Sequence, residues 1–139
     1  MITQDIAELR QHALDLFETT LADVPLFIAD VDDVEPDEQG VWCVFVVNPD
    51  TNEEATIGIN SIYDQRGTAN LMITQPKGVE IATSEYGAWD IAEIAMRHFR
   101  SLTGDDNRLR VIRTIPSRIP NDDGLQVNLL ILYRSRHTS

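Results

Sequence analysis

The chain has 139 residues, of which 42% are hydrophobic and 24% charged, and these values are typical of one folded domain. The formal net charge of −12 excludes a broadly basic surface of the kind that grips nucleic acid. No apolar run approaches the ~20 residues of a membrane-spanning helix, and the N-terminal residues lack the pattern of a signal peptide. We therefore expect one soluble domain, covering residues 1–139, that is made in the cytoplasm and does not enter a membrane.

Charge is divided unevenly along the chain. Residues 1–65 contain 15 acidic residues and one basic residue, whereas residues 66–139 contain eight acidic and ten basic residues. The charges lie among apolar residues, so we expect oppositely charged faces on one domain. A soluble acidic protein with a few paired arginines fits the same pattern.

The first predicted element is a helix over residues 3–22, because apolar residues recur there every three or four positions. Pro25 ends the pattern. Residues 29–40 (ADVDDVEPDEQG) are acidic and rich in turn formers, and this composition predicts a mobile loop.

Two strands are predicted in the middle of the chain. Residues 41–48 (VWCVFVVN) form an apolar run that is typical of a buried strand, and residues 49–52 carry a turn signal. Residues 54–59 are expected to add a short exposed strand. Apolar alternation over residues 67–75 predicts the next full strand, which ends at the turn formers of residues 76–78.

A second amphipathic helix is predicted to begin at Thr83 or Ser84 and to run to about Thr103, with Gly104 at its C-terminal cap. Its apolar stripe predicts packing on a sheet. We expect the large ring of Trp89, on the flank of this stripe, and that of Trp42, in the buried strand, to lie in the core.

Residues 109–119 and 125–133 are predicted to form a final pair of strands, and Pro116 and Pro120 indicate that the first of them is an edge strand or bends. The polar residues 135–139 are expected to fray. The order of elements predicts an α+β fold: a mixed, mainly antiparallel sheet with two amphipathic helices packed against it.

The sequence contains no recognisable catalytic or ligand-binding motif. Its single cysteine, Cys43, lies in an apolar run and is expected to be buried and inert. His12, His98 and His137 do not form a metal-ligand pattern, and the acidic segment lacks the central glycine of a calcium loop. We therefore predict that the protein is not an enzyme and needs no metal or cofactor.

Several stretches resemble the phage tail terminator family. They are residues 66–78 (RGTANLMITQPKG), residues 83–102 (TSEYGAWDIAEIAMRHFRSL), and the basic strand, hairpin and final strand that follow. The family's helix pattern is matched by Ile91, Ala92, Ala95 and Phe99, and its aromatic–basic close by Tyr133 and Arg134. The resemblance spans residues 2–134, and the acidic loop at residues 29–40 departs from it.

The resemblance implies a structural protein of the virion tail, assembled in the host cytoplasm. It implies a homohexameric ring that caps the head-proximal end of the tail tube, stops tube polymerisation and joins the tail to the head. The expected partners are further copies of the chain, the major tail-tube protein and a head-completion or connector protein. DNA passes through the lumen of such a ring without specific binding.

The charged residues suggest which surfaces would serve this role. An acidic lumen repels DNA phosphates, so we expect the lumen or a neighbouring ring to face Asp32, Asp33, Glu35, Asp37 and Glu38. Arginines are expected to contact an adjacent subunit or the tube protein, namely Arg108, Arg110, Arg113, Arg118 and Arg134.

Three other functions remain open at this point. A head-completion or neck ring (stopper or adaptor) would be a small α/β protein of similar kind. A ligand-binding or enzymatic domain would require a deep apolar pocket with convergent polar groups. A non-viral acidic binding module would need little beyond the acidic surface.

Overall fold

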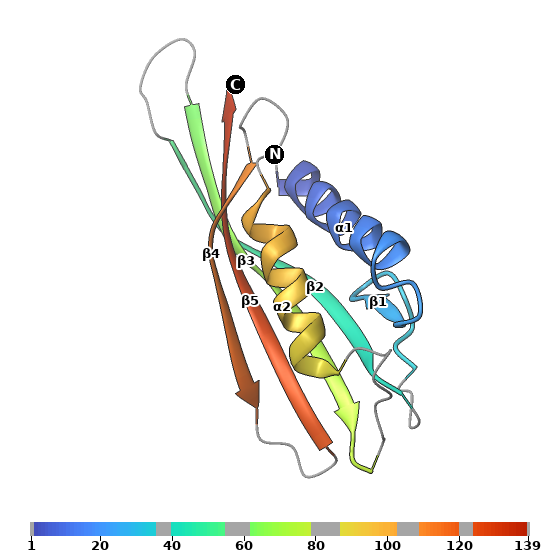
Figure 1. Ribbon diagram of the computed structural model, residues 1–139. Helices are drawn as coiled ribbons and strands as arrows, with labels where there is room; N and C mark the ends of the chain where they lie inside the picture. The colour runs from blue at the N-terminus through green and yellow to red at the C-terminus, as the bar shows by residue number, and fades with distance from the viewer. Residues whose placement is uncertain are drawn as a thin grey trace.

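The computed structural model describes residues 2–35, 40–54, 62–78, 87–102, 109–119 and 124–138. It contains two helices, α1 (Ile2–Thr19) and α2 (Ala88–Arg100), shown in Figure 1. Its strands are β1 (Leu26–Ile28), β2 (Trp42–Glu54), β3 (Ile62–Pro76), β4 (Leu109–Ile119) and β5 (Gly124–Thr138). The predicted α+β class is confirmed.

The described strands form one sheet in the order β1-β2-β3-β5-β4. The β1–β2 pair is parallel and the other pairs are antiparallel, so the sheet is mixed but mainly antiparallel. Strand β4 is an edge strand, as its prolines predicted, and β1 lies at the opposite edge. Residues near β1 and residues on β4 are therefore separated by the full width of the sheet.

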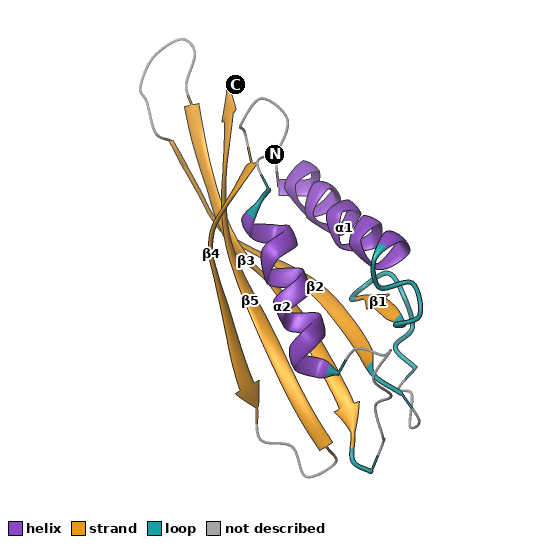
Figure 2. Ribbon diagram, viewed as in Figure 1, coloured by secondary structure: helices purple, strands orange, loops and turns teal. Residues whose placement is uncertain are grey.

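Both helices lie on the same face of the sheet, as Figures 1 and 2 show. Helix α1 packs over β1 and β2, whereas α2 packs over β3, β4 and β5. The helix face of the sheet is apolar because alternate residues of each strand point to the same side. On α2 the buried residues recur at helical spacing: Ala88, Ile91, Ala92, Ala95 and Phe99.

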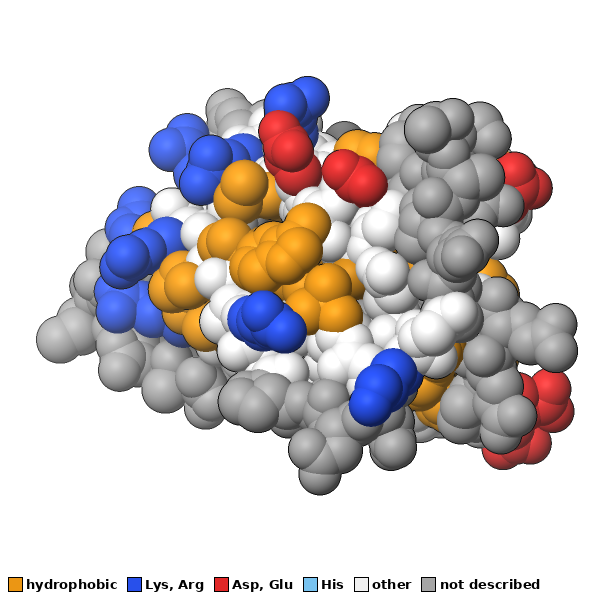
Figure 3. Space-filling model, turned by 60° about the horizontal axis from the view of Figure 1, so that its bottom comes forward, with side chains coloured by type: hydrophobic (Ala, Val, Ile, Leu, Met, Phe, Trp, Pro, Cys, Tyr) orange, Lys and Arg blue, Asp and Glu red, His pale blue; other side chains and the backbone are white. Residues whose placement is uncertain are grey.

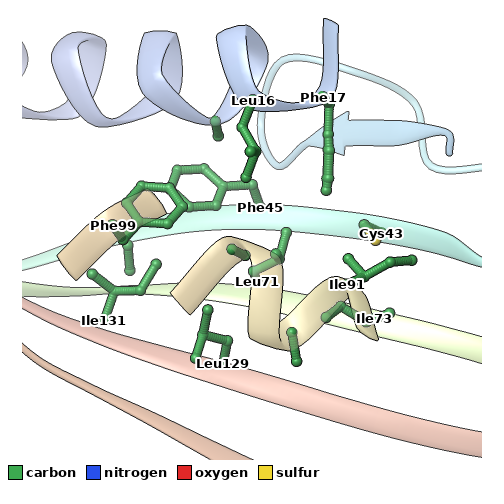
Figure 4. Close-up of a cluster of buried hydrophobic side chains, with 14 of the residues drawn as sticks. Leu16, Phe17, Cys43, Phe45, Leu71, Ile73, Ile91, Phe99, Leu129 and Ile131 are labelled. Carbon is green, nitrogen blue, oxygen red and sulfur yellow. The ribbon is translucent and has the colours of Figure 1, made fainter. Parts of the chain in front are cut away.

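The core lies between this face and the helices (Figure 4). The ring of Phe99 from α2 stacks on that of Phe45 from β2, with ring centroids 5.8 Å apart and planes 9° from parallel. Leu71 from β3 and Ile131 from β5 are buried beside them. These long-range contacts hold α2 on the sheet, because aromatic pairs contribute both buried area and specific geometry.

Strand β2 is longer than predicted, and the turn expected at residues 49–52 is wrong. The strand continues to Glu54 and stays paired with β3 by shifting its register between Pro49 and Thr51. Such a bulge absorbs an extra residue without ending the strand. The short strand expected at residues 54–59 overlaps β2 at Glu54 and otherwise lies outside the described residues.

Strand β1 and the turn after it were not predicted. The strand has three residues, too few to show a periodic pattern, and pairs with Cys43–Phe45 in parallel. The following residues form a tight turn, in which the backbone N–H groups of Val31 and Asp32 donate to the carbonyl of Ile28. The loop predicted from residue 29 therefore begins as hydrogen-bonded structure.

The C-terminal end does not fray as expected. Strand β5 continues to Thr138 and pairs with β3 along its length. Ser135 is fully buried, and its hydroxyl donates a hydrogen bond to the carboxyl of Asp5 in the first turn of α1. A polar sequence is ordered here because its hydroxyl has a buried partner from the other end of the chain.

Helix α2 begins later than predicted. Its N-cap is Gly87, whose N–H donates to the carboxylate of Asp90 at 3.0 Å, and the N–H of Ala88 donates to the side-chain oxygen of Gln75 at 3.1 Å. Thr83 and Ser84, the predicted caps, and Gly104 at the other end lie outside the described residues.

Candidate assembly interface

The buried cysteine offers no reactive group. Cys43 is fully buried, and desolvation by this burial raises the pKa of its thiol far above the ordinary value. The thiol stays protonated at neutral pH, whereas nucleophilic and metal-binding cysteines act as thiolates. Over the described residues, no three His, Cys, Asp or Glu side chains are grouped closely enough to hold a metal ion.

Two histidines meet where the helices pack against each other. The rings of His12 on α1 and His98 on α2 lie edge to face with centroids 6.2 Å apart. Burial lowers the pKa of His98, and the nearby His12 lowers it further, while a backbone hydrogen bond at His12 and the carboxylate of Asp15 act in the opposite direction. The pair therefore favours the neutral form of His98 in the folded protein.

This shift predicts acid sensitivity. A histidine whose folded pKa lies below its unfolded value of 6.5 resists protonation in the folded state, whereas the unfolded chain takes up the proton. The free energy of unfolding is thus expected to fall as pH drops below about 6.5, because the unfolded state then binds more protons. Urea denaturation at pH 7.5 and pH 5.5 measures the effect, and His98→Gln should reduce the difference. An unchanged difference in this variant would contradict the assignment.

The arginines predicted at an interface are divided between two faces. Cross-strand partners in a sheet share a face, so Arg110 and Arg134, which are register partners, lie together on the face without helices. Arg113 pairs with Leu132 on this face as well. Arg118 is opposite Val127, a core residue, and therefore lies on the helix side at the other end of β4. Arg108 lies outside the described residues.

The sequence did not single out Arg66 as part of this group. Its backbone pairs with that of Arg134, so the register places Arg66, Arg134 and Arg110 in one row across β3, β5 and β4. Like charges opposite each other destabilise a sheet unless an anion compensates them. The row is a basic region on the helix-free face, and only strand pairing could have revealed it.

One group of exposed acidic residues lies at the opposite edge. Asp30, Asp32, Asp33 and Glu35 follow β1 directly and are exposed. Asp32 has a structural role as well, because its carboxylate accepts a hydrogen bond from the N–H of Ile28 at 2.8 Å. Asp37 and Glu38, the other acidic residues expected at a functional surface, lie outside the described residues.

Strand β4 contains arginines and no acidic residue, whereas residues 30–35 contain acidic residues and no basic one. The two segments lie at opposite edges of the same sheet. For these two segments, the difference in charge along the sequence is therefore also a separation in space, between one edge of the sheet and the other.

The face of the sheet without helices is partly apolar. Trp42, predicted in the core, lies here with its ring edge to face against that of Phe27, at a centroid distance of 6.4 Å. At the centre the amide of Asn128 donates to the side-chain oxygen of Asn70 at 3.2 Å. The apolar positions around these pairs are Val44, Val46, Met72, Ile115, Leu130 and Leu132. Such a mixed face is typical of a sheet that is solvated on one side.

A second exposed apolar region lies beside β4 on the helix side. Trp89, also predicted in the core, is 47% exposed on α2. It shares a flank of the helix with Arg100, whose side chain reaches β4 and donates to the hydroxyl of Thr114 at 2.9 Å. Figure 3 shows apolar side chains gathered on this end of the molecule, with Lys and Arg side chains and also Asp or Glu side chains beside them. Both sides of the β4 edge therefore combine apolar and basic groups.

Comparison with known proteins supports the fold alone. No family model matches the chain, and no curated protein matches it either. A solved protein that carries only a serial identifier as its name has 16% identity and a TM-score of 0.56, and the match covers 91% of this chain and 94% of that one. The α+β architecture thus occurs in a protein of similar length. None of the described helices is long and apolar enough to cross a membrane.

Proposed function

We propose that the protein is a non-enzymatic structural protein of the virion, a tail terminator that forms a ring on the head-proximal end of the tail tube. The observation that carries this proposal is the placement of basic and acidic segments on opposite edges of one sheet. The resemblance of residues 2–134 to the tail terminator family supplies the identity of the ring. In this role the ring stops tube polymerisation and joins the tail to the head-completion proteins.

Opposite edges of opposite charge suit a ring for a geometric reason. A two-fold dimer brings the same patch of both copies together, and a charged edge would then meet its own charge. A head-to-tail contact brings unlike edges together instead, and it closes into a ring when the rotation between copies allows. Complementary charge also fixes the register and orientation of neighbouring copies.

The net charge agrees with passage of DNA. With a net charge of −12 per copy, a ring remains strongly acidic after its edges pair. An acidic lumen repels the phosphate backbone, so DNA slides through without being held. The central, partly apolar part of the helix-free face and the apolar region around Trp89 are then available to the tube protein and to the connector protein, the other two expected partners.

The proposal is tested by native mass measurement and negative-stain electron microscopy. The purified protein is imaged alone, with its tail-tube protein, and with the head-completion protein of the same virus. We expect a closed ring of about 94 kDa for six copies of 15.7 kDa, or a cap at one end of each tube. A ring that binds the head-completion protein and not tubes would identify this protein as a neck protein. A monomer that binds neither would leave an acidic binding module.

A further inference from the structure

Two exposed segments of the chain complement each other in both charge and hydrophobicity. Strand β4 displays Arg110, Arg113 and Arg118 together with Ile112, which is 61% exposed. The segment 30–35 displays acidic residues together with Val31, which is 64% exposed, and Val34. Exposed aliphatic side chains among like charges are typical of surfaces that bind a partner of opposite charge.

The two segments cannot meet within one molecule. They occupy opposite edges of a sheet whose described strands number five, and neighbouring strands lie about 4.8 Å apart. The complement of each segment is therefore found on a second copy of the chain. Since each copy offers one segment of each kind, such a contact is head to tail and propagates from copy to copy.

The β4 edge is poorly suited to pairing with another strand through its backbone. It carries a register irregularity between Val111 and Arg113, and Pro116 lacks the N–H that a ladder requires. Edge strands that carry charges, bulges and prolines resist edge-to-edge pairing. A partner would therefore bind this edge through its side chains, which are the exposed arginines and isoleucines.

A hydrogen-bonded turn fixes the beginning of the acidic segment. Its turn is fixed by hydrogen bonds to the backbone of Ile28, and Asp30 adopts a left-handed conformation with φ of 68°. Asp32 is engaged in this turn, which leaves Asp33 and Glu35 as the exposed acidic groups after it. Residues 28–32 are already folded in this turn, so their part of the segment loses less conformational freedom on binding than a flexible loop would.

We propose that the acidic segment 30–35 of one copy docks on the β4 edge of the next copy. Val31 and Val34 pack against the exposed Ile112, and Asp33 and Glu35 pair with Arg110 and Arg113. Within the described part of the chain, neither arginine forms an ion pair. The ring built from this contact rests on the proposed function, but the contact itself requires only a second copy. It assigns Asp33 and Glu35 to a subunit interface, where the sequence suggested the lumen or a neighbouring ring.

Cysteine cross-linking tests the geometry. Ile112→Cys is combined with Val31→Cys or with Val34→Cys, and the protein is treated with a mild oxidant at high concentration and on tail tubes. A disulfide forms only when the Cα atoms approach within about 7 Å, so a ladder of covalent oligomers is expected from at least one combination. The native Cys43 is buried and does not interfere. The control combines Ile112→Cys with Leu14→Cys on α1. Leu14 is 42% exposed but lies outside the proposed contact, so this combination should give no covalent oligomers.

Charge exchange tests the chemistry. The double variant Arg110→Glu and Arg113→Glu is expected to weaken association at least about tenfold, and Asp33→Arg with Glu35→Arg in the same chain should restore it. Arg97→Glu, at an exposed arginine of α2 outside both proposed segments, should leave association unchanged. Restoration distinguishes a direct contact from a loss of folding.

The outcomes separate this inference from the proposed function. Rings or tube caps without a ladder from either cysteine combination would overturn the docking contact and leave the terminator proposal intact. A ladder in a protein that never closes a ring or caps a tube would confirm the contact and overturn the terminator proposal. Dimers from Ile112→Cys alone would show that β4 meets β4 and would also overturn the contact.

Discussion

Replacing Phe99 by alanine is expected to lower the free energy of unfolding by about 3–5 kcal/mol, the range for large aromatic residues in a core. The side chain of Phe99 is fully buried and stacks on Phe45, so its removal leaves a cavity between α2 and the sheet. Equilibrium urea denaturation followed by far-ultraviolet circular dichroism measures the change, provided that the transition remains two-state.

A matched control lies on the same helix. Trp89→Ala removes a larger ring from a position that is 47% exposed, and it should change the free energy of unfolding by much less than Phe99→Ala. Similar losses in the two variants would mean that Trp89 is as deeply packed as Phe99 and would contradict the described helix orientation. Trp89→Ala is also informative for assembly, since an exposed ring beside the β4 edge is a natural contact for a neighbour.

Elements with a strong local pattern were predicted well from the sequence. The bounds of β4 agree with the prediction of residues 109–119, and the stripe of α2 from Ala88 to Phe99 is buried as expected. These segments have long periodic runs, so the side chains alone report which face is covered. The edge position of β4 also followed from a local cause, because Pro116 has no backbone N–H to donate to a neighbouring strand.

The failures have a common physical origin in long-range contacts. Strand β1 has three residues, too few to show a periodic pattern, and its parallel pairing with β2 leaves no hairpin turn in the sequence that could reveal it. The turn signal at residues 49–52 lost to pairing with β3, which a bulge preserves. Polar residues at the C-terminus were expected to fray, yet Ser135 is buried because Asp5 lies near it, 130 positions away in the chain.

The two tryptophans show the limit of reasoning from hydrophobicity. Large rings are usually buried, and both were assigned to the core. Trp42 instead alternates onto the helix-free face, because its neighbour Cys43 takes the position that faces the helices. Trp89 lies beside the apolar stripe of α2, on a flank of the helix that the sheet does not cover, and is 47% exposed. Which flank of an element is covered depends on its partners, and sequence periodicity does not report them.

The candidate interface was predicted in part. The uneven charge of the two halves of the chain was visible in the sequence, and the fold places the acidic segment 30–35 and strand β4 at opposite edges. The sequence grouped Arg118 with Arg110, although register places them on different faces. It also missed Arg66, which strand pairing brings into the row with Arg134. The number and sign of the charges can thus be read from the sequence, whereas the strand register is needed to show which charged residues share a face of the sheet.

Gly67→Ala is expected to destabilise the fold by at least about 1–3 kcal/mol, the cost of overpacking a filled core. A Cβ at this position would lie 2.5 Å from the phenol oxygen of Tyr133 and 2.8 Å from the backbone oxygen of Asn48. The ring of Tyr133 is buried and covers the backbone of β3 here. Gly67 belongs to the segment that resembles the tail terminator family, and its role is structural: it makes room for the aromatic residue near the end of β5.

A double-mutant cycle isolates this cause. If the clash with Tyr133 dominates, Gly67→Ala should be less costly in a Tyr133→Leu background than in the wild-type chain. Some cost should remain, because the carbonyl of Asn48 is backbone and cannot rotate away. Thr68→Ala, on the helix-free face of the same strand, serves as the control and should be nearly neutral. Equal costs of Gly67→Ala in both backgrounds would show that the backbone contact, and not the ring of Tyr133, demands glycine.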